Sequence, residues 1–254
     1  MKIKRILVSQ PAPASEKSPY FDIAQKYGVE MVFRPFIKVE GLPVKEFRQS
    51  KINLADYTGV IFTARTAVDN FFRLCEEMRY TVPATMKYFC TTESIALYLQ
   101  KYIVYRKRKI FFGTTGKFND PQLLAALVKN QKENFLLPVS DVHKDTDELK
   151  ELDKAGIKYT KVIMYRTVSN DFRPDEKLDY DMLLFFSPAG IASLKKNFPE
   201  FDQKGSHIRI GAYGPSTAKA VTDAGLTLDV SAPNAKAPSM TAALEQYLRD
   251  QQDN

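Results

Sequence analysis

Short apolar segments alternate with amphipathic helical segments along almost the whole chain. Continuous apolar runs separated by helical patterns are typical of parallel strands whose sheet is covered by helices on both faces. We expect strands over residues 5–9, 30–35, 59–63, 88–91, 109–113, 134–138, 161–165, 182–187, 208–212 and 227–230. The helical patterns cover residues 66–77, 93–101, 120–130, 146–155, 188–197, 215–224 and 240–249. The alternation therefore predicts an α/β fold with parallel sheets flanked by helices.

An internal repeat divides this pattern into two related parts. Residues 59–68 resemble residues 182–191, because each segment is an apolar strand that ends in a hydroxyl residue and leads at once into a helix. Residues 88–96 resemble residues 210–218 in the same way and follow in the same order. The repeat predicts two similar lobes, although so short a match also occurs by chance between generic α/β units.

Two extended, helix-poor segments, residues 36–53 and 165–177, interrupt the alternation. If both are crossovers between lobes, the middle of the chain is a lobe inserted between an N-terminal strand–helix–strand and a C-terminal remainder. We therefore expect a discontinuous lobe of residues 1–38 plus 172–254, an inserted lobe of residues 54–163, and interlobe connectors at 39–53 and 164–171. Lobes joined by two connectors can hinge, and the cleft between them is the expected ligand site.

Composition excludes several classes of protein. With 44% hydrophobic and 26% charged residues, 254 residues can form one large core or two modest cores. No stretch approaches the roughly 18 apolar residues of a membrane span, and Ser9-Gln10 ends the first apolar run too early for a signal peptide. Cys75 and Cys90 lie within apolar runs and do not indicate a disulfide scaffold. We expect a soluble protein of the cytoplasm.

The net charge of +7 leaves the class of partner open among nucleic acid, an anionic membrane surface and an acidic small molecule. The densest cationic cluster is Arg106 to Lys109, within a strand-like stretch. It is either a solvated lead-in to a buried strand or an RNA-binding patch, and no interleaved aromatic residues of the single-strand-binding kind accompany it. RNA binding would depend steeply on salt.

Motifs for metals, nucleotides and covalent catalysis are missing from the sequence. The two histidines and two cysteines do not have the spacing of metal ligands. We find no phosphate-binding Gly-Lys-Ser/Thr loop, no dinucleotide fingerprint and no nucleophile elbow. The sequence therefore predicts no metal, no nucleotide cofactor and no covalent nucleophile.

Hydroxyl- and glycine-rich turns follow several expected strands. They are residues 63–66, 91–94, 113–117, 187–190 and 214–217. In an open α/β sheet such turns converge at the carboxyl ends of the strands, and each helix start presents unpaired N–H groups with partial positive charge. One such turn binds an anion, and several together would bind a polyanion. The alternative is that Ser, Thr and Gly are present only as helix caps and turn formers.

The order of four segments resembles the uroporphyrinogen-III synthase family. These are residues 62–68, 162–167, 186–190 and 211–218, within a likeness that runs from Ile6 to about Leu248. The family is defined more by layout than by invariant residues. The most specific matches are the tyrosine connector with Thr167, the Ser-Pro turn at Ser187 and the Gly-Pro-Ser-Thr turn at Gly214.

This resemblance implies two α/β lobes joined by a two-stranded linker, with the active site in the cleft. It implies a lyase of tetrapyrrole (haem) biosynthesis that needs no cofactor. Hydroxymethylbilane would lose water and close to uroporphyrinogen III with its terminal ring D inverted. This substrate carries eight carboxylates, which suits the positive charge and the N–H-rich turns. We expect a monomer with no nucleic-acid or membrane partner.

The resemblance also implies roles for particular residues. Loss of the ring A hydroxyl as water would give an azafulvenium cation, and ring D would attack through a spirocyclic intermediate. Tyr165 matches the family tyrosine at the cleft edge and is the candidate catalytic residue, although it could instead be an aromatic packed between the lobes. The candidate substrate-binding residues are Thr63, Arg65, Thr66, Thr92, Ser94, Thr114, Ser187, Gly190, Gly214, Pro215, Ser216 and Thr217.

The chain departs from the family pattern in the inserted lobe. Thr92 and Ile95 stand where the family often has a small residue followed by Thr, so this turn is expected to bind more weakly. Ala64 replaces a frequent Ser or Pro, while Arg65 is available to a carboxylate unless it is only a solvated helix-start residue. The alternative function is a non-catalytic, two-lobed binder of an acidic metabolite, because such a protein would have the same hinge and the same turns.

Overall fold

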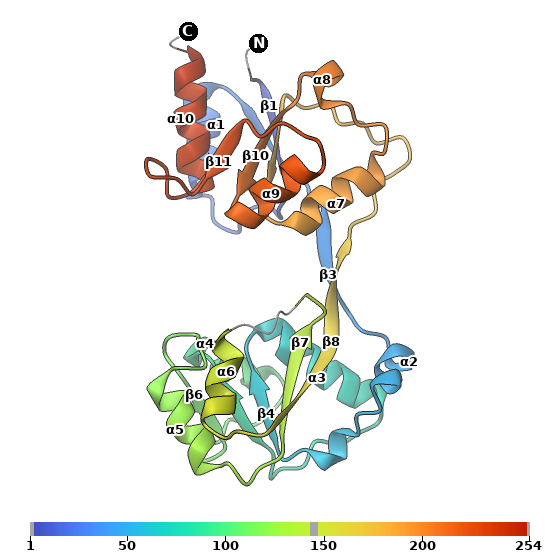
Figure 1. Cartoon of the computed structure of the whole chain (residues 1–254), viewed down its shortest axis with the longest axis vertical. Helices are drawn as coiled ribbons and strands as arrows, with labels where there is room; N and C mark the ends of the chain where they lie inside the picture. The colour runs from blue at the N-terminus through green and yellow to red at the C-terminus, as the bar shows by residue number, and fades with distance from the viewer. Residues whose placement is uncertain (1–2, 143–146, 253–254) are drawn as a thin grey trace. The chain divides into compact units, whose positions relative to one another are not determined.

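The computed structural model describes residues 3–142 and 147–252, and Figure 1 labels most of its helices and strands. The chain forms two compact units. Unit 1 consists of residues 1–38 and 168–254, and unit 2 consists of residues 39–167. Within the described ranges, no helix has the length and apolar character that crossing a membrane requires.

Unit 1 is built on a five-stranded sheet with the order β11-β10-β9-β1-β2, in which every neighbouring pair is parallel. Its strands are β1 (Arg5–Val8), β2 (Glu30–Phe33), β9 (Met182–Phe185), β10 (Arg209–Tyr213) and β11 (Val230–Ala232). Its helices are α1 (Pro19–Tyr27), α7 (Pro188–Asn197), α8 (Gln203–Ser206), α9 (Pro215–Asp223) and α10 (Met240–Gln252).

Helices cover both faces of this sheet. Ile6 of β1 packs in one buried cluster with Leu244 of α10 and with residues of α1. The next residue, Leu7, packs in a second cluster with Ile191 of α7 and Val221 of α9. Because successive side chains of a strand point to opposite faces, both must be apolar when both faces are covered. The apolar run of β1 therefore follows from its central place in the sheet.

Unit 2 is built on a six-stranded sheet with the order β3-β8-β7-β4-β5-β6, of which β3 begins and β8 ends in residues assigned to unit 1. Its strands are β3 (Ile37–Gly41), β4 (Gly59–Phe62), β5 (Lys87–Cys90), β6 (Ile110–Phe112), β7 (Phe135–Ser140) and β8 (Tyr159–Ser169). Its helices are α2 (Val44–Phe47), α3 (Arg65–Glu77), α4 (Glu93–Tyr98), α5 (Pro121–Lys129) and α6 (Asp147–Lys154). Short 3-10 turns lie at Arg48–Ser50, Leu54–Asp56 and Leu99–Lys101. The pairs of β4 with β5 and β7, of β5 with β6, and of β7 with β8 are parallel.

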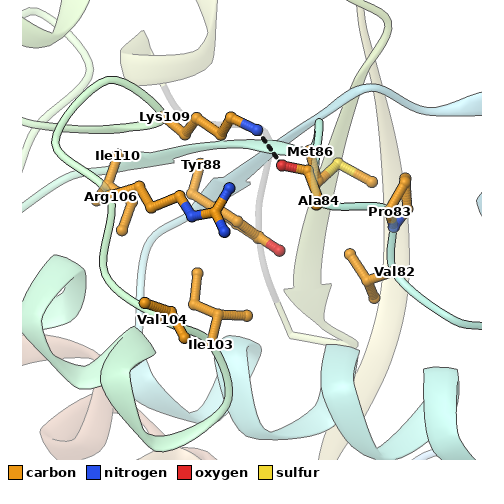
Figure 2. A pocket seen from close by; sticks show the side chains of 10 residues that line it. All are labelled: Val82, Pro83, Ala84, Met86, Tyr88, Ile103, Val104, Arg106, Lys109 and Ile110. Carbon is orange, nitrogen blue, oxygen red and sulfur yellow. Dashed lines mark hydrogen bonds between the residues drawn. The ribbon is translucent and has the colours of Figure 1, made fainter.

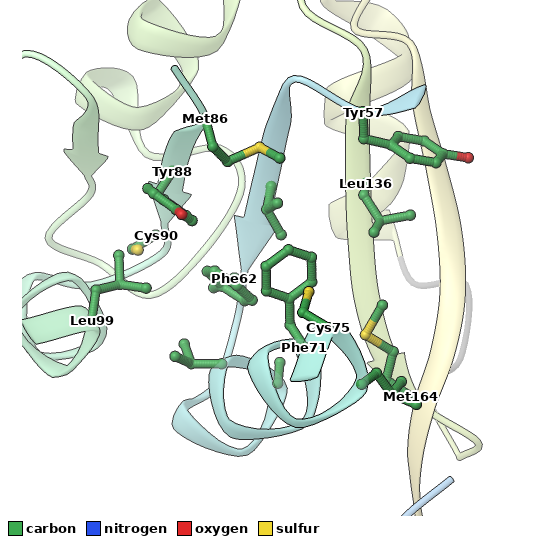
Figure 3. Close-up of a cluster of buried hydrophobic side chains, with 14 of the residues drawn as sticks. Tyr57, Phe62, Phe71, Cys75, Met86, Tyr88, Cys90, Leu99, Leu136 and Met164 are labelled. Carbon is green, nitrogen blue, oxygen red and sulfur yellow. The ribbon is translucent and has the colours of Figure 1, made fainter. Parts of the chain in front are cut away.

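Two apolar clusters also lie on opposite faces of the sheet of unit 2. Phe62 of β4 packs with Phe71 of α3, with ring centroids 5.7 Å apart, and Figure 3 shows this cluster. Its neighbour Ile61 belongs to the opposite cluster, with Leu127 of α5 and Leu152 of α6. Helices α3 and α4 therefore cover one face, and α5 and α6 cover the other.

The α/β class with parallel sheets flanked by helices is confirmed, whereas several element boundaries differ from the expectation. A strand, β3, lies within the segment 36–53 that was expected to be extended and helix-poor, and β8 is longer than the expected strand 161–165. Lys38 and Glu40 interrupt the apolar pattern of β3, so periodicity does not reveal it. Helix α1 fits the helix expected between the first two strands, helices α2 and α8 were not expected, and residue 146 of the expected helix 146–155 lies outside the described residues.

Each unit has a point where the connections after neighbouring strands diverge to opposite faces. In unit 1, β1 leads into α1 on one face, whereas its neighbour β9 leads into α7 on the other. In unit 2, β4 leads into α3 and its neighbour β7 into α6. Ligands of open α/β sheets bind outside the carboxyl ends of the strands at such switch points. The loops after β4 and β9 are therefore the places to examine for a site.

Candidate functional site

The start of α3, at the switch point of unit 2, leaves backbone amides without a partner. Its N-cap, Ala64, has no side-chain cap, and the Ala64 carbonyl accepts the N–H groups of Ala67 and Val68 at 3.1 and 3.3 Å. The amides of Arg65 and Thr66 have no acceptor within the described chain. These two N–H groups lie at the positive end of a 13-residue helix and fit an anion.

Arg65 adds a full positive charge to this helix start. Its side chain is exposed, and its guanidinium carbon lies 5.3 Å from the centre of the Tyr98 ring. No ion pair of Arg65 is present among the residues that the structure describes. The guanidinium can therefore pair with a carboxylate from solution while it keeps its contact with the ring. Thr63 and Thr66, both half-buried, lie in the same turn.

The turn before α4 is closed by its own side chains. The Thr92 hydroxyl accepts the N–H of Ile95 at 3.4 Å and lies 3.3 Å from the Ser94 hydroxyl. Helix α4 has only six residues, so its dipole is smaller than that of α3. Thr92 and Ser94 therefore already have local partners, which agrees with the weaker binding expected for this turn.

A carboxylate of the protein itself occupies the turn 113–117. One oxygen of Asp120 accepts the N–H groups of Thr114 and Thr115 and the Thr114 hydroxyl at 2.9–3.0 Å. The other oxygen accepts the N–H groups of the first turn of α5. Asp120 is only 1% exposed, and its backbone donors, Thr114 first, hold the pKa of its carboxyl well below its usual range. The turn thus binds a carboxylate, but an internal one.

Sequence reasoning missed this function of Asp120, which it placed only at the start of an expected helix. The signal was present, because an aspartate directly before a proline is a common helix N-cap. The donors predicted to reach a ligand from Thr114 are engaged with Asp120 in this structure.

In unit 1, the turn after β9 is also capped by its own side chain. The Ser187 hydroxyl accepts the N–H of Gly190 at 3.3 Å. Gly190 is buried, and a Cβ atom there would lie 3.1 Å from the ring of Phe185. Gly190 therefore allows α7 to pack closely on the end of β9, next to the switch point.

The start of α9 resembles the start of α3, because no side chain caps it. Gly214 adopts a left-handed backbone, with φ of 87°, and donates its own N–H to the carbonyl of Ala232. Pro215 has no N–H, and Ala218 donates to the Gly214 carbonyl. The amides of Ser216 and Thr217 lack acceptors in the described part of the chain. Ser216 is exposed, whereas the Thr217 side chain is only 1% exposed, so it is the amides that are suited to an anion.

An aromatic pair beside these turns was also missed by sequence reasoning. Tyr213, at the end of β10, is 39% exposed, and its ring centroid lies 6.2 Å from that of Phe186 after β9. An exposed tyrosine directly before the Gly-Pro-Ser-Thr turn could have been noticed in the sequence. Aromatic faces next to free amides suit a ligand that carries both flat rings and carboxylates.

Tyr165 lies in β8 and is 9% exposed. It packs in the apolar cluster of unit 2 that also contains Phe47 and Met164. Burial raises the pKa of its phenol, so the group stays protonated throughout the neutral range. Among residues 3–142 and 147–252, its hydroxyl has no hydrogen-bond partner. Its role as a catalytic acid stays a prediction.

Of the predicted turns, 63–66 and 214–217 have no side-chain cap, 91–94 and 187–190 are capped by a hydroxyl of their own, and 113–117 holds an internal carboxylate. The uncapped turns present the amides of Arg65 with Thr66 and of Ser216 with Thr217. No group of three or more His, Cys, Asp or Glu side chains gathers as a metal site in the described ranges. The free amides and Arg65 are therefore the features of these turns most suited to bind negatively charged groups.

Comparison with known proteins adds independent information. A family model described as "Uroporphyrinogen-III synthase HemD" matches residues 19–242. Uroporphyrinogen-III synthase of Saccharomyces cerevisiae is 29% identical over 127 residues. That match covers 45% of this chain and 46% of the yeast protein, so the matched stretch spans about half the length of this relative.

Solved structures are similar over nearly the whole chain. A uroporphyrinogen-III synthetase from Helicobacter pylori aligns with 97% of this chain and 99% of its own, at 15% identity and a TM-score of 0.52. A mutant uroporphyrinogen III synthase from the extremely thermophilic bacterium Thermus thermophilus aligns with 99% of this chain and 100% of its own, at 16% identity and a TM-score of 0.47. At 15% identity and a TM-score of 0.52, the likeness to the Helicobacter pylori structure supports the fold of this chain and nothing about its activity.

Proposed function

The chain belongs to the uroporphyrinogen-III synthase family, and on that premise we propose that it converts hydroxymethylbilane to uroporphyrinogen III. The reaction is a cyclising dehydration in tetrapyrrole biosynthesis, which makes the protein a lyase. The observation that carries the proposal beyond family membership is the uncapped start of α3 beside the unpaired cation of Arg65. A substrate with eight carboxylates needs several anion-binding positions of this kind.

In the proposed reaction, the protein mainly positions its substrate. The ring A hydroxyl leaves as water and gives a delocalised azafulvenium cation. Ring D then attacks through its substituted carbon, forms a spirocyclic intermediate, fragments and closes in the inverted orientation. Direct closure without inversion gives the type I isomer, so the protein must hold the linear tetrapyrrole in the conformation that favours inversion.

We propose that backbone amides at the starts of α3 and α9 bind substrate carboxylates, and that Arg65 pairs with one of them. The remaining candidate residues stay predictions, and the Thr92, Thr114 and Ser187 hydroxyls already have partners inside the protein. These candidates are Thr63, Thr92, Ser94, Thr114, Ser187 and Gly190. We retain as proposals the division into lobes at 1–38 plus 172–254 and 54–163, with connectors at 39–53 and 164–171.

The product isomers test this function directly. The protein is supplied with freshly generated hydroxymethylbilane, the products are oxidised to porphyrins, and the type I and type III isomers are separated by chromatography. We expect predominantly the type III isomer. Type I alone, the product of unassisted closure, would favour the alternative of a non-catalytic binder of an acidic metabolite.

We expect the Tyr165→Phe variant to turn over more slowly than the wild type and to form the same isomer. General acid assistance contributes typically about 10²–10⁴-fold, but a phenol whose pKa is raised by burial is a weak acid, so we expect a loss at or below the lower end of that range. Initial rates and product isomers are measured for both proteins at matched concentration. An unchanged rate together with an unchanged product would remove Tyr165 from the mechanism.

We further propose that the protein acts as a monomer in the cytoplasm and binds no nucleic acid. The proposal on nucleic acid is supported by the family, whose substrate is a small tetrapyrrole. Light scattering coupled to size-exclusion chromatography measures the oligomeric state. Retention on immobilised RNA at low salt would contradict the proposal on nucleic acid.

A further inference from the structure

A second pocket in unit 2 lies away from the strand-end turns. It has a volume of about 190 Å³ and is lined by Val82, Pro83, Ala84, Met86, Tyr88, Ile103, Val104, Arg106, Lys109 and Ile110 (Figure 2). Residues 82–86 lead into the amino end of β5, and residues 103–109 lead into the amino end of β6. The turns 91–94 and 113–117 follow the opposite, carboxyl ends of the same strands. The pocket is therefore separate from the candidate site in this unit.

The wall of the pocket contains a buried hydroxyl that has no partner among the residues that the structure describes. Tyr88 is only 4% exposed, and its hydroxyl forms no hydrogen bond with any residue in the described ranges. Figure 2 shows this hydroxyl directed into the space between Arg106, Ile103 and Val82. Buried hydroxyls almost always have a hydrogen-bond partner, and a missing partner calls for an explanation such as a bound ligand.

The two cations of the pocket have different roles. Lys109 donates a hydrogen bond from its Nζ atom to the carbonyl of Ala84, which joins the two segments that form the walls (Figure 2). Arg106 is exposed and forms no ion pair and no side-chain hydrogen bond in the part of the chain that the structure describes. One guanidinium therefore remains available at the pocket, on the same side as the unpartnered hydroxyl.

The remaining lining is apolar. Val82, Pro83, Met86, Ile103 and Ile110 supply aliphatic and thioether surface around the Tyr88 ring. A dry apolar cavity of about 150 Å³ binds benzene, so a pocket of about 190 Å³ can hold a phenyl-sized group with part of a short arm. An apolar lining with few convergent polar groups is usual for small-molecule sites, and the volume of about 190 Å³ restricts the ligand to a smaller molecule than most such sites hold.

We propose that this pocket binds a small amphipathic carboxylate, with its aromatic or branched aliphatic body against the apolar wall. The carboxylate pairs with the guanidinium of Arg106 and accepts a hydrogen bond from the Tyr88 hydroxyl. Both partners lack an internal acceptor among the described residues, so the ligand replaces only water at these groups. The site is independent of the proposed synthase activity, because it shares no residue with the turns that we assign to substrate binding.

The test titrates ¹⁵N-labelled protein with 3-phenylpropionate and follows the backbone amides by NMR. We expect saturable shifts confined to residues 82–88 and 103–110. The neutral isostere 3-phenylpropionamide is expected to bind at least about fivefold more weakly, because it lacks the charge that Arg106 recognises. Absence of saturable shifts with 3-phenylpropionate would overturn the proposal. Shifts confined to the turns 63–66 or 214–217 would also overturn it.

Single substitutions test whether Arg106 and Tyr88 contact the bound carboxylate. Arg106→Gln is expected to weaken the binding of 3-phenylpropionate about tenfold, and Tyr88→Phe about threefold. Tyr88→Phe should leave the melting temperature unchanged or raise it, because it removes a buried hydroxyl without a partner. Arg108→Gln is the matched control, because this exposed cation of the same segment does not line the pocket. Equal weakening by Arg106→Gln and Arg108→Gln would overturn the proposed contact.

Discussion

Ala64→Asp is expected to raise the stability of unit 2 and to lower kcat/KM about 100-fold. Ala64 is the N-cap of α3 and offers no side-chain acceptor to the first amides of the helix. An aspartate at this position would supply that acceptor, and such a cap stabilises a helix by about 0.5–2 kcal/mol relative to alanine. The same carboxylate would occupy the amides that we assign to the substrate and would repel the carboxylates of the substrate.

Opposite changes in stability and activity separate this effect from misfolding. Because the chain contains no tryptophan, unfolding is followed by circular dichroism, and kcat/KM is measured by the formation of the type III isomer. Ala64→Ser is the control: it supplies a neutral cap, so we expect a gain in stability with a smaller loss of activity. A more stable Ala64→Asp protein with wild-type kcat/KM would show that the start of α3 does not bind substrate.

Arg65→Gln is expected to lower kcat/KM about 10–100-fold while the fold is retained. A charge-assisted hydrogen bond is worth about 1.5–3 kcal/mol, and each 1.4 kcal/mol corresponds to a factor of ten. The only contact that the structure gives to the guanidinium among the described residues is with the Tyr98 ring, so the loss of stability should stay below about 1 kcal/mol.

Two further variants control this experiment. Arg108→Gln removes an exposed positive charge of the same unit, outside the strand-end turns, and should leave kcat/KM within about twofold of the wild type. Arg65→Lys keeps the charge but loses the bidentate geometry, so it should recover only part of the activity. If Arg65→Gln and Arg108→Gln have the same kcat/KM, the contact of Arg65 with a substrate carboxylate is refuted.

The class of fold could be predicted from the sequence because the strands are buried on both faces. The segment around Phe62 is continuously apolar, and this is the pattern that helices on both sides of a parallel sheet require. The segment of β3 was expected to be extended but was given no strand bounds, since Lys38 and Glu40 leave it without such a run. Its pairing with β8 is a long-range contact, which local periodicity does not encode.

The candidate turns could be found from the residue types in the sequence. Whether the hydroxyls and amides of each turn already bond to other groups of the protein could not be predicted in this way. Thr92 and Ser187 look like ligand-binding hydroxyls in the sequence, yet each caps its own helix. Ala64 reads as a departure from the family pattern, yet it leaves the start of α3 without a side chain that could compete with a ligand for the first amides. Hydroxyl residues at a helix start favour internal capping, so a small residue there can be the better indication of an anion site.

The pocket beside Tyr88 shows a further limit of sequence reasoning. The cluster of Arg106 to Lys109 indicated either a solvated lead-in to a strand or an RNA-binding patch. In the structure, Lys109 joins two wall segments and Arg106 lines an apolar pocket with Tyr88. These residues come from separate segments of the chain, and their pattern along the sequence does not place them together.

The most direct test of the proposed synthase activity is the ratio of type III to type I isomer. This ratio is measured while the protein concentration is raised and the amount of fresh hydroxymethylbilane is kept fixed. Spontaneous closure supplies the type I background in every sample, so each reaction contains its own reference. We expect the wild type to shift the product almost completely to type III, and Ala64→Asp at equal concentration to leave type I dominant. A wild-type ratio equal to that of the reaction without protein would contradict the account.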